Sequence, residues 1–171
     1  MEPFISHLFQ IGILVENVEE SIRHYEMEYG IGPWEILDFG PKLFPKMLVD
    51  GKPGMLEIRC AFCKAFGMEI ELVEPVSKSV YKDWVAQHGN GLHHLAVRTR
   101  DKFPDVLAEH ARLTGGRAPW IHAKEDNGKD GEGMEFAYLD LRKELGLILE
   151  IYNEERTGGL PFAAETKGET S

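Results

Sequence analysis

The 171-residue chain has few cysteines, no long apolar run and no targeting motif. Cys60 and Cys63 lack a second pair, so a structural zinc site would miss half of its ligands, and we expect two reduced thiols. Without an apolar stretch long enough for a bilayer, no membrane span is expected. The first residues lack a basic segment followed by an apolar stretch, which predicts no secretion signal and a cytoplasmic protein.

Positive charge is also scarce. Lysine and arginine total 19 against 29 acidic residues, which gives a net charge of -10 and a pI near 5.2. A nucleic-acid partner would demand a basic patch, so this balance disfavours one and favours small-molecule partners. The hydrophobic content of 43% is ordinary for a globular protein, and the length suits one compact unit.

Hydrophobic periodicity predicts the same order of elements twice. The first half reads as a strand at 10–15, a helix that Asn17 caps and Gly30 ends, and strands at 34–40, 55–62 and 67–75. A linker helix at 79–88 follows. The second half reads as a strand at 93–99, a helix at 101–113 with Asp101 as the cap, and strands at 115–123, 134–141 and 145–153.

Each half is a βαβββ unit that is too small to bury its own sheet face, so the two must pack around a shared cleft. We therefore predict an α+β fold in which two tandem modules, at about 7–76 and 91–153, form an open, barrel-like curved sheet. Together they make a single domain over 1–153, and 154–171 is expected to be a flexible tail because it is polar and rich in small residues.

Strand parity selects the residues that face the cleft. Side chains alternate along a strand, so His93 and His94 are expected to point in opposite directions, with His94 toward the cleft. The same argument places Gln10, Glu71 and Glu150 on the cleft faces of otherwise apolar strands. Burial of four polar groups is costly unless something pairs with them, either one another through hydrogen bonds or a cation.

One imidazole, two carboxylates and one amide oxygen suit an octahedral divalent ion, and zinc, nickel, cobalt, manganese and iron(II) all stay open. The predicted ligands are Gln10, Glu71, His94 and Glu150. His7 is an alternative first ligand if the strand begins earlier or bulges. His93 is expected to be a packed or hydrogen-bonded histidine instead of a ligand.

Four stretches, QIGILVENVEESIRHYEMEYGIGPW, MEIELVEP, GNGLHHLAVRT and LGLILEIYN, resemble the vicinal oxygen chelate superfamily, which includes glyoxalase I, methylmalonyl-CoA epimerase, extradiol dioxygenases and bleomycin-resistance proteins. The resemblance runs from about residue 7 to 153. It implies paired βαβββ modules around a metal, with ligands at the positions of Gln10, Glu71, His94 and Glu150. It also implies a homodimer and a small carbonyl or thioester substrate.

Departures from each branch narrow the resemblance. Gln10 stands where extradiol dioxygenases have a histidine. Leu14 and Pro75 stand where animal glyoxalases I have an arginine and an asparagine for glutathione. Methylmalonyl-CoA epimerases share GLHH and the proline of ELVEP, although they usually have histidine at the position of Gln10. The uncharacterised glyoxalase-like members with GIGPW resemble the chain best.

This resemblance implies an isomerase, epimerase or lyase that removes a proton next to a carbonyl while a metal stabilises the enolate. The candidate bases are Glu150, Glu71 and Glu57, the last of which is expected to face the cleft together with Arg59. Two alternatives stay open: a metal-free drug or metabolite binder of the bleomycin-resistance type, and an iron(II) dioxygenase. Trp34, Phe62 and Phe66 are candidate pocket walls.

Overall fold

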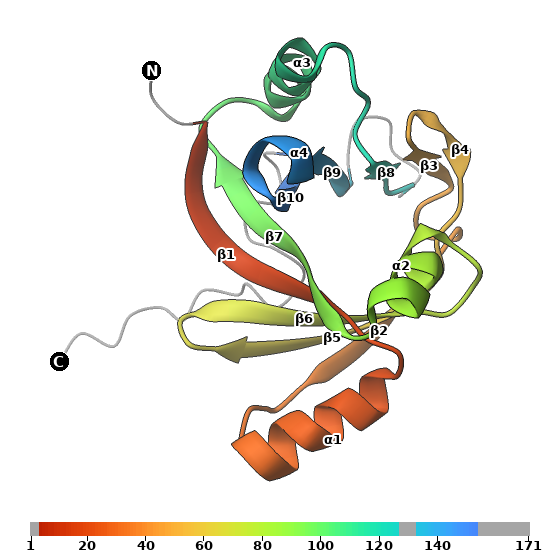
Figure 1. Ribbon diagram of the computed structural model, residues 1–171, viewed down its shortest axis with the longest axis vertical. Coiled ribbons are helices and arrows are strands. Elements are labelled where there is room, and N and C mark those ends of the chain that lie inside the picture. Colours follow the sequence, from red (N-terminus) through yellow and green to blue (C-terminus); the bar gives the residue numbers. More distant parts are fainter. Residues whose placement is uncertain (1–3, 127–132, 154–171) are drawn as a thin grey trace, which may run out of the picture.

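The structure is a computed structural model that describes residues 4–126 and 133–153. A single ten-stranded sheet curves around its concave face without closing (Figure 1), in the strand order β2-β5-β6-β1-β7-β10-β9-β8-β3-β4. Both the α+β class and the open, curved sheet are therefore as predicted. The tail at 154–171, which is predicted to be flexible, lies outside the described residues.

Most strands of the first half form one arm of the sheet, and the helix of that half packs against them. Its elements are β1 (Ile5–Leu14), α1 (Val18–Tyr29), β2 (Glu35–Phe39), β5 (Ile58–Ala65) and β6 (Met68–Pro75). The ends of α1 follow the sequence signals: the Asn17 side chain accepts a hydrogen bond from the Glu20 amide, and Gly30 ends the helix in the left-handed conformation. A linker helix, α2 (Val80–His88), begins after Ser79 as expected.

The second half repeats this order. Its elements are β7 (Gly91–Thr99), α3 (Phe103–Thr114), β8 (Ile121–Lys124), β9 (Glu135–Leu141), the single-turn α4 (Arg142–Leu145) and β10 (Leu147–Tyr152). The predicted cap of α3 is wrong, since Lys102 and not Asp101 precedes the helix and makes no side-chain capping bond. Pro104 lies in the first turn, where its missing N–H costs nothing, and this placement sets the later start.

Sequence reasoning missed a hairpin between the second and third strands of the first half. Strands β3 (Lys46–Val49) and β4 (Lys52–Gly54) pair through a turn at Asp50 and Gly51, both of which have positive φ. A two-residue Asp-Gly loop is a strong hairpin signal. The hairpin leaves its own half and adds β3 to β8, at the edge of the second half, so the chain nearly encircles the concave face.

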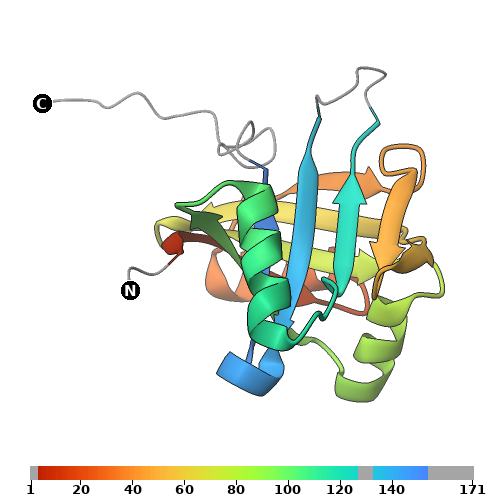
Figure 2. The same cartoon turned by 90° about the horizontal axis from the view of Figure 1, so that it is seen from above.

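The two halves meet where β1 and β7 pair in antiparallel fashion at the middle of the sheet. One apolar cluster lies between α1 and the outer face of the first half and includes Val15, Val18 and Ile70. Another lies beneath α3, which runs along the outer side of the second half (Figure 2). A third fills the concave side. Helices α1 and α3 therefore cover the convex face, whereas α2 packs into the concave cluster through Tyr81 and Val85, so polar groups on the concave face lie among apolar side chains.

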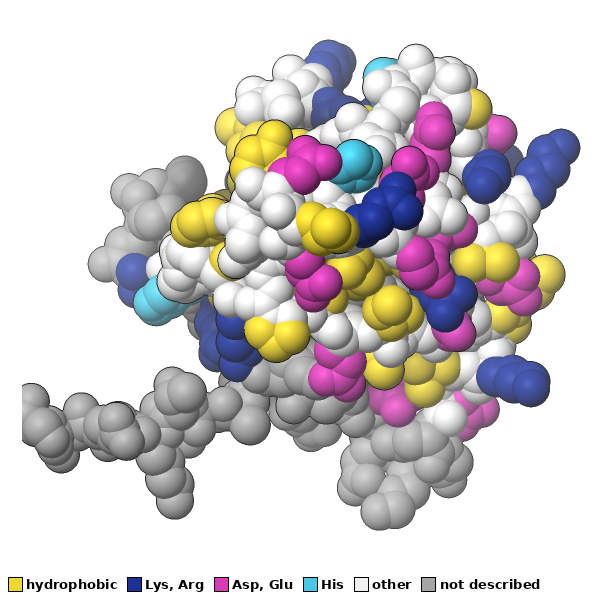
Figure 3. Space-filling model, turned by 90° about the horizontal axis from the view of Figure 1, so that it is seen from below, with side chains coloured by type: hydrophobic (Ala, Val, Ile, Leu, Met, Phe, Trp, Pro, Cys, Tyr) yellow, Lys and Arg dark blue, Asp and Glu magenta, His cyan; other side chains and the backbone are white. Residues whose placement is uncertain are grey.

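The surface around α1, seen from below, mixes acidic, basic and hydrophobic side chains (Figure 3). This face shows no large area of a single charge. Among the described residues, none of the helices is long and apolar enough to cross a bilayer. The predicted homodimer and cytoplasmic location stay predictions.

Candidate metal centre

Two rows of residues cross the four central strands on the concave face. In the first row, Gly12 of β1 lies between Glu71 of β6 and His94 of β7. In the second row, Ala96 of β7 lies between Gln10 of β1 and Glu150 of β10. Each row therefore has one polar side chain on each side of a residue with little or no side chain. The two polar groups can approach each other above that residue.

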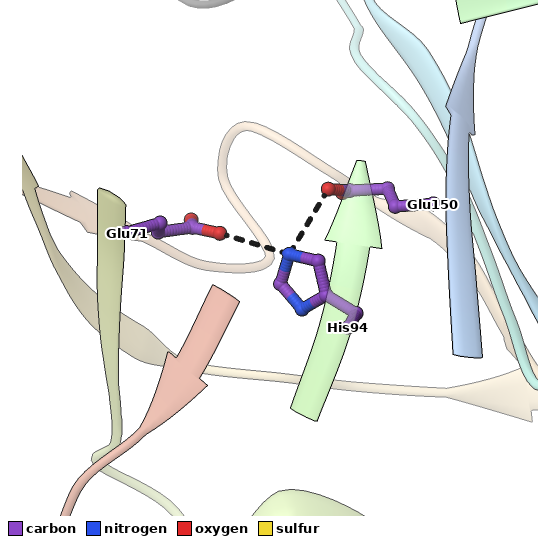
Figure 4. Close-up of side chains that lie close together, drawn as sticks. All are labelled: Glu71, His94 and Glu150. Carbon is purple, nitrogen blue, oxygen red and sulfur yellow. Dashed lines mark ion pairs between the residues drawn. The ribbon is translucent and has the colours of Figure 1, made fainter. Parts of the chain in front are cut away.

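Three of these side chains converge on one point (Figure 4). The Nε2 atom of His94 lies 3.2 Å from Oε2 of Glu71 and 3.2 Å from Oε2 of Glu150. Ligand atoms of the three residues all lie within 4.8 Å of one another, and the three side chains are almost fully buried. The cluster thus joins one imidazole and two carboxylates from three different strands.

The convergence does not produce satisfied hydrogen bonds. Nε2 of His94, Oε2 of Glu71 and Oε2 of Glu150 are all buried, and within the described part of the chain none has a hydrogen-bond partner. Buried polar atoms normally have one, and leaving them without costs about 1–3 kcal/mol each. A divalent cation would satisfy all three at once, and the donor set suits zinc, nickel, cobalt, manganese or iron(II).

Gln10 is the fourth predicted ligand, and its amide has one free side. Its Nε2 donates a 2.7 Å hydrogen bond to Oε1 of Glu69, while its Oε1 is buried without a partner among the described residues. Because the carboxylate of Glu69 accepts and the amide nitrogen donates, Glu69 fixes which way the amide turns. The oxygen is therefore the atom left available for a cation.

Electrostatics couple the cluster tightly. Burial lowers the pKa of His94, but attraction to Glu150 and Glu71 outweighs it and raises the pKa to about 9. The pKa of Glu71 is raised, chiefly because burial disfavours its charged form. Cys60 lies close by with a pKa well above its usual value, because of burial and then repulsion from Glu71. In the absence of a cation, ion-pair attraction between His94 and the two carboxylates therefore holds the cluster together.

Gly12 is a functional position that the sequence analysis did not identify. A Cβ atom built on it would lie 1.9 Å from Cε1, 2.2 Å from Nε2 and 2.3 Å from Nδ1 of His94. The imidazole therefore lies directly over this glycine, and any side chain there would displace it. A glycine in the middle of an apolar strand is the signal that could have identified the position, since it often marks a close approach.

The comparisons with known proteins identify the family of the chain. The family described as the Glyoxalase/Bleomycin resistance protein/Dioxygenase superfamily matches residues 9–138, which is most of the chain. The chain belongs to this superfamily. The resemblance to the vicinal oxygen chelate superfamily is thereby confirmed. No curated protein sequence matches the chain.

Solved structures show the same fold at low identity. A hypothetical protein from Bacillus halodurans is 19% identical, with a TM-score of 0.51, over 85% of this chain and 92% of that one. Two variants of a Streptomyces coelicolor methylmalonyl-CoA epimerase, each in complex with 2-nitronate-propionyl-CoA, are 20% identical with TM-scores of 0.51. They match over 86% of this chain and 94% or 96% of theirs. These similarities establish the fold of this superfamily member but do not identify its substrate.

The prediction that His93 and His94 point in opposite directions is wrong. The register between β1 and β7 shifts at this point, because Gly12 pairs with His94 and Ile13 pairs with Leu92, so His93 is the extra residue of a bulge. The two Nδ1 atoms lie 3.2 Å apart, and both rings contact Tyr138. The expectation that His93 is packed is confirmed, since it is buried against Tyr81 and two tryptophans.

The structure places Glu57 outside the cluster. Glu57 is exposed, and the inner face of β5 carries Ile58 and Cys60. Arg59 instead projects to the outer face, where it pairs with Glu19 of α1 at 3.2 Å. The predicted cleft-side parity of Glu57 and Arg59 is therefore wrong, because the strand enters the sheet at Ile58 with the opposite phase.

Other candidates also divide. His7 is exposed, three residues before Gln10, so it does not replace the amide. Trp34 packs against Tyr25 of α1 on the outer side, and Phe66 is 78% exposed at a turn, so neither is a wall of the cleft. Phe62 is buried in the concave cluster but is not among the residues that line the hollow beside Glu71 and Glu150. Parity along a strand could not predict where these side chains lie, because their positions depend on where each strand begins and ends in the sheet.

Proposed function

We propose that this superfamily member is a metal-dependent isomerase, epimerase or lyase that removes a proton next to the carbonyl of a small carbonyl or thioester compound. The observation that carries the proposal is the convergence of Glu71, His94 and Glu150, whose ligand atoms are buried together without hydrogen-bond partners in the described chain. Gln10 supplies a fourth donor through its free amide oxygen. Four donors would leave an octahedral ion two open positions for substrate or water.

A bound divalent ion would polarise the carbonyl oxygen and lower the cost of the negative charge that develops when the neighbouring proton leaves. The chain's own residues would position the substrate and move the proton. His94 and Gln10 are rigidly placed, the first above Gly12 and the second by Glu69. Both residues therefore suit the role of a metal ligand that takes no part in proton transfer.

Glu150 is our choice for the base that takes the proton. Its side chain lines a hollow together with that of Glu71, so a substrate in the hollow would lie beside both. The hydroxyl-bearing ring of Tyr152 lies beside Glu150, and burial followed by repulsion from Glu150 raises its pKa well above the usual value. Tyr152 therefore stays neutral, so it adds no charge beside the base.

Deuterium exchange would test the proposal. The protein loaded with zinc, nickel, cobalt or manganese is incubated in D2O with small hydroxyketones, the hemithioacetals of 2-oxoaldehydes and acyl thioesters, and NMR follows deuterium entry next to the carbonyl. We expect metal-dependent exchange with at least one class. Glu150→Gln should lower the rate by about 100-fold or more, as loss of a general base does.

Glu57→Gln provides the comparison, because this exposed carboxylate lies outside the cluster and its loss should leave most of the exchange. Loss of exchange in Glu57→Gln with retention in Glu150→Gln would show that the base is assigned wrongly. A protein that binds no divalent ion but retains apolar ligands would instead be a binding protein, and the enzymatic proposal would be wrong.

A further inference from the structure

A bulge in β7 brings the rings of two adjacent histidines together. In an unbroken strand, neighbouring side chains point to opposite faces, so the rings of His93 and His94 could not meet. The pairing with β1 passes from Gly12 opposite His94 to Ile13 opposite Leu92, which leaves His93 as the extra residue. Bulges of this kind change the direction of a side chain and are frequent beside active sites. The Nδ1 atoms of the two rings consequently lie 3.2 Å apart, within hydrogen-bond distance.

Aromatic side chains hold the ring of His93 in this position. The residue is only 5% exposed. Its ring centroid lies 4.8 Å from that of Tyr81 and 5.7 Å from that of Trp84, both of which belong to the linker helix α2. It also lies 5.2 Å from the ring of Trp120, which directly precedes β8. Close packing on several sides restricts rotation of the ring, so Nδ1 of His93 stays directed at His94.

The position of one proton decides which of the two rings donates. Facing ring nitrogens form a hydrogen bond only when one carries a proton and the other is bare. The opposite nitrogen of His94, Nε2, lies 3.2 Å from an oxygen of Glu71 and of Glu150, yet it makes no hydrogen bond within the described part of the chain. The lone pair of Nε2 is what a cation at the cluster would need, so the proton of a neutral His94 belongs on Nδ1. Nδ1 of His93 is then the acceptor.

We propose that His93 is a positioning residue for the metal site: its Nδ1 accepts the Nδ1–H of His94, which keeps the lone pair of His94 on Nε2 and holds the ring above Gly12. Groups that accept the free N–H of a ligating histidine fix its tautomer and orientation, and their loss costs about 10–100-fold in metal affinity. This inference rests on the proposed function, because it assumes a divalent ion at Glu71, His94 and Glu150.

The protonation of the two rings in the zinc-loaded full chain tests the proposal. In protein with ¹⁵N-labelled histidine, long-range proton–nitrogen spectra distinguish a protonated ring nitrogen from a bare one. The signals that His93→Asn removes identify His93, and the signals that zinc shifts identify His94. We expect a proton on Nδ1 of His94 and a bare Nδ1 on His93. A proton on Nδ1 of His93 would overturn the proposal.

Two substitutions separate the hydrogen-bond acceptor from the packing of the ring. His93→Asn keeps an acceptor, since its amide oxygen is bonded to Cγ as Nδ1 is, but removes the ring. His93→Phe keeps a ring and removes the acceptor. In a competition titration with a chelating dye, zinc affinity should fall by about tenfold or more in His93→Phe and stay within about threefold of the parent chain in His93→Asn. Thermal melting of the metal-free chains should show the larger loss in His93→Asn, which leaves a cavity among the aromatic rings.

The opposite ranking of the zinc affinities would show that the ring acts only by packing, and it would overturn the proposal. Equal affinities of the two variants, whether like the parent chain or weakened, would overturn it as well. If the parent chain binds zinc but catalyses no deuterium exchange, the proposed function fails and the role of His93 still stands or falls on these titrations. A folded parent chain that takes up no zinc would overturn the proposed function first, and this inference with it.

Discussion

Gly12→Ala is the smallest change that should remove the metal site. The added Cβ would lie 1.9 Å from Cε1 of His94, whereas carbon atoms in contact are about 3.5–4.0 Å apart, so the ring must retreat by roughly 1.5 Å. A metal–ligand distance tolerates only about ±0.2 Å, so a displacement of that size removes the imidazole as a ligand.

Affinity for zinc should therefore fall by more than about 100-fold, since changes to supporting groups alone cost 10–100-fold. Stability should fall as well, by about 1–3 kcal/mol, because the core is overpacked. The sign of this stability change separates the two possibilities. Glycine inside a strand normally costs about 0.5–1 kcal/mol relative to alanine, so a substitution that met no obstacle would stabilise the protein.

A competition titration against a chelating dye measures the affinity, and thermal melting of the metal-free chain measures the stability. Gly40→Ala is the matched control, because its added Cβ would lie 3.5 Å from Cγ of Glu57, an ordinary contact. The control should bind zinc like the parent chain. A Gly12→Ala protein that binds zinc equally well and melts no lower would refute the placement of His94 over this strand.

Two further predictions concern the groups around the cluster. Glu69→Leu should lower zinc affinity by about 10–100-fold because the Gln10 amide loses its 2.7 Å anchor, whereas Glu69→Gln keeps an acceptor and should lose less. A dye titration that finds Glu69→Leu unchanged would show that the amide needs no such support. Since His94 has a pKa of about 9, zinc binding at pH 7 should release about one proton and tighten roughly 50-fold between pH 7 and pH 9, which calorimetry in two buffers detects. Correspondingly, the stability that this proton gives the metal-free chain is complete below about pH 6.5 and is lost as the pH rises through 9. Zinc binding without proton release would contradict the coupled cluster.

The repeated order of elements and the cleft residues followed from sequence because both depend on local periodicity. Gln10 and Glu150 interrupt otherwise apolar strands, and the alternation of a strand then fixes their face. The internal repeat supplied the rest, since it placed β1 and β7 at equivalent positions and so brought Gln10 near His94.

What the sequence left open depends on insertions and on register. The parity argument assumes that side chains alternate without interruption along a strand. The bulge at His93 interrupts this alternation, so the two adjacent histidines do not point to opposite faces. Glu57 lies just before β5 begins, where a phase error of one residue reverses the face. The β3–β4 hairpin carried an Asp-Gly turn, but its partner is β8, about 70 residues away, and no local pattern predicts such a pairing.

The metal content of the full chain tests the central claim most directly. The protein is prepared without chelators, reloaded with zinc, nickel, cobalt or manganese, passed through a desalting column and analysed for metal and protein together. We predict about one divalent ion per chain, and none in His94→Ala. A correctly folded protein that retains no ion from any of these solutions, or a His94→Ala variant that retains a full equivalent, would contradict it.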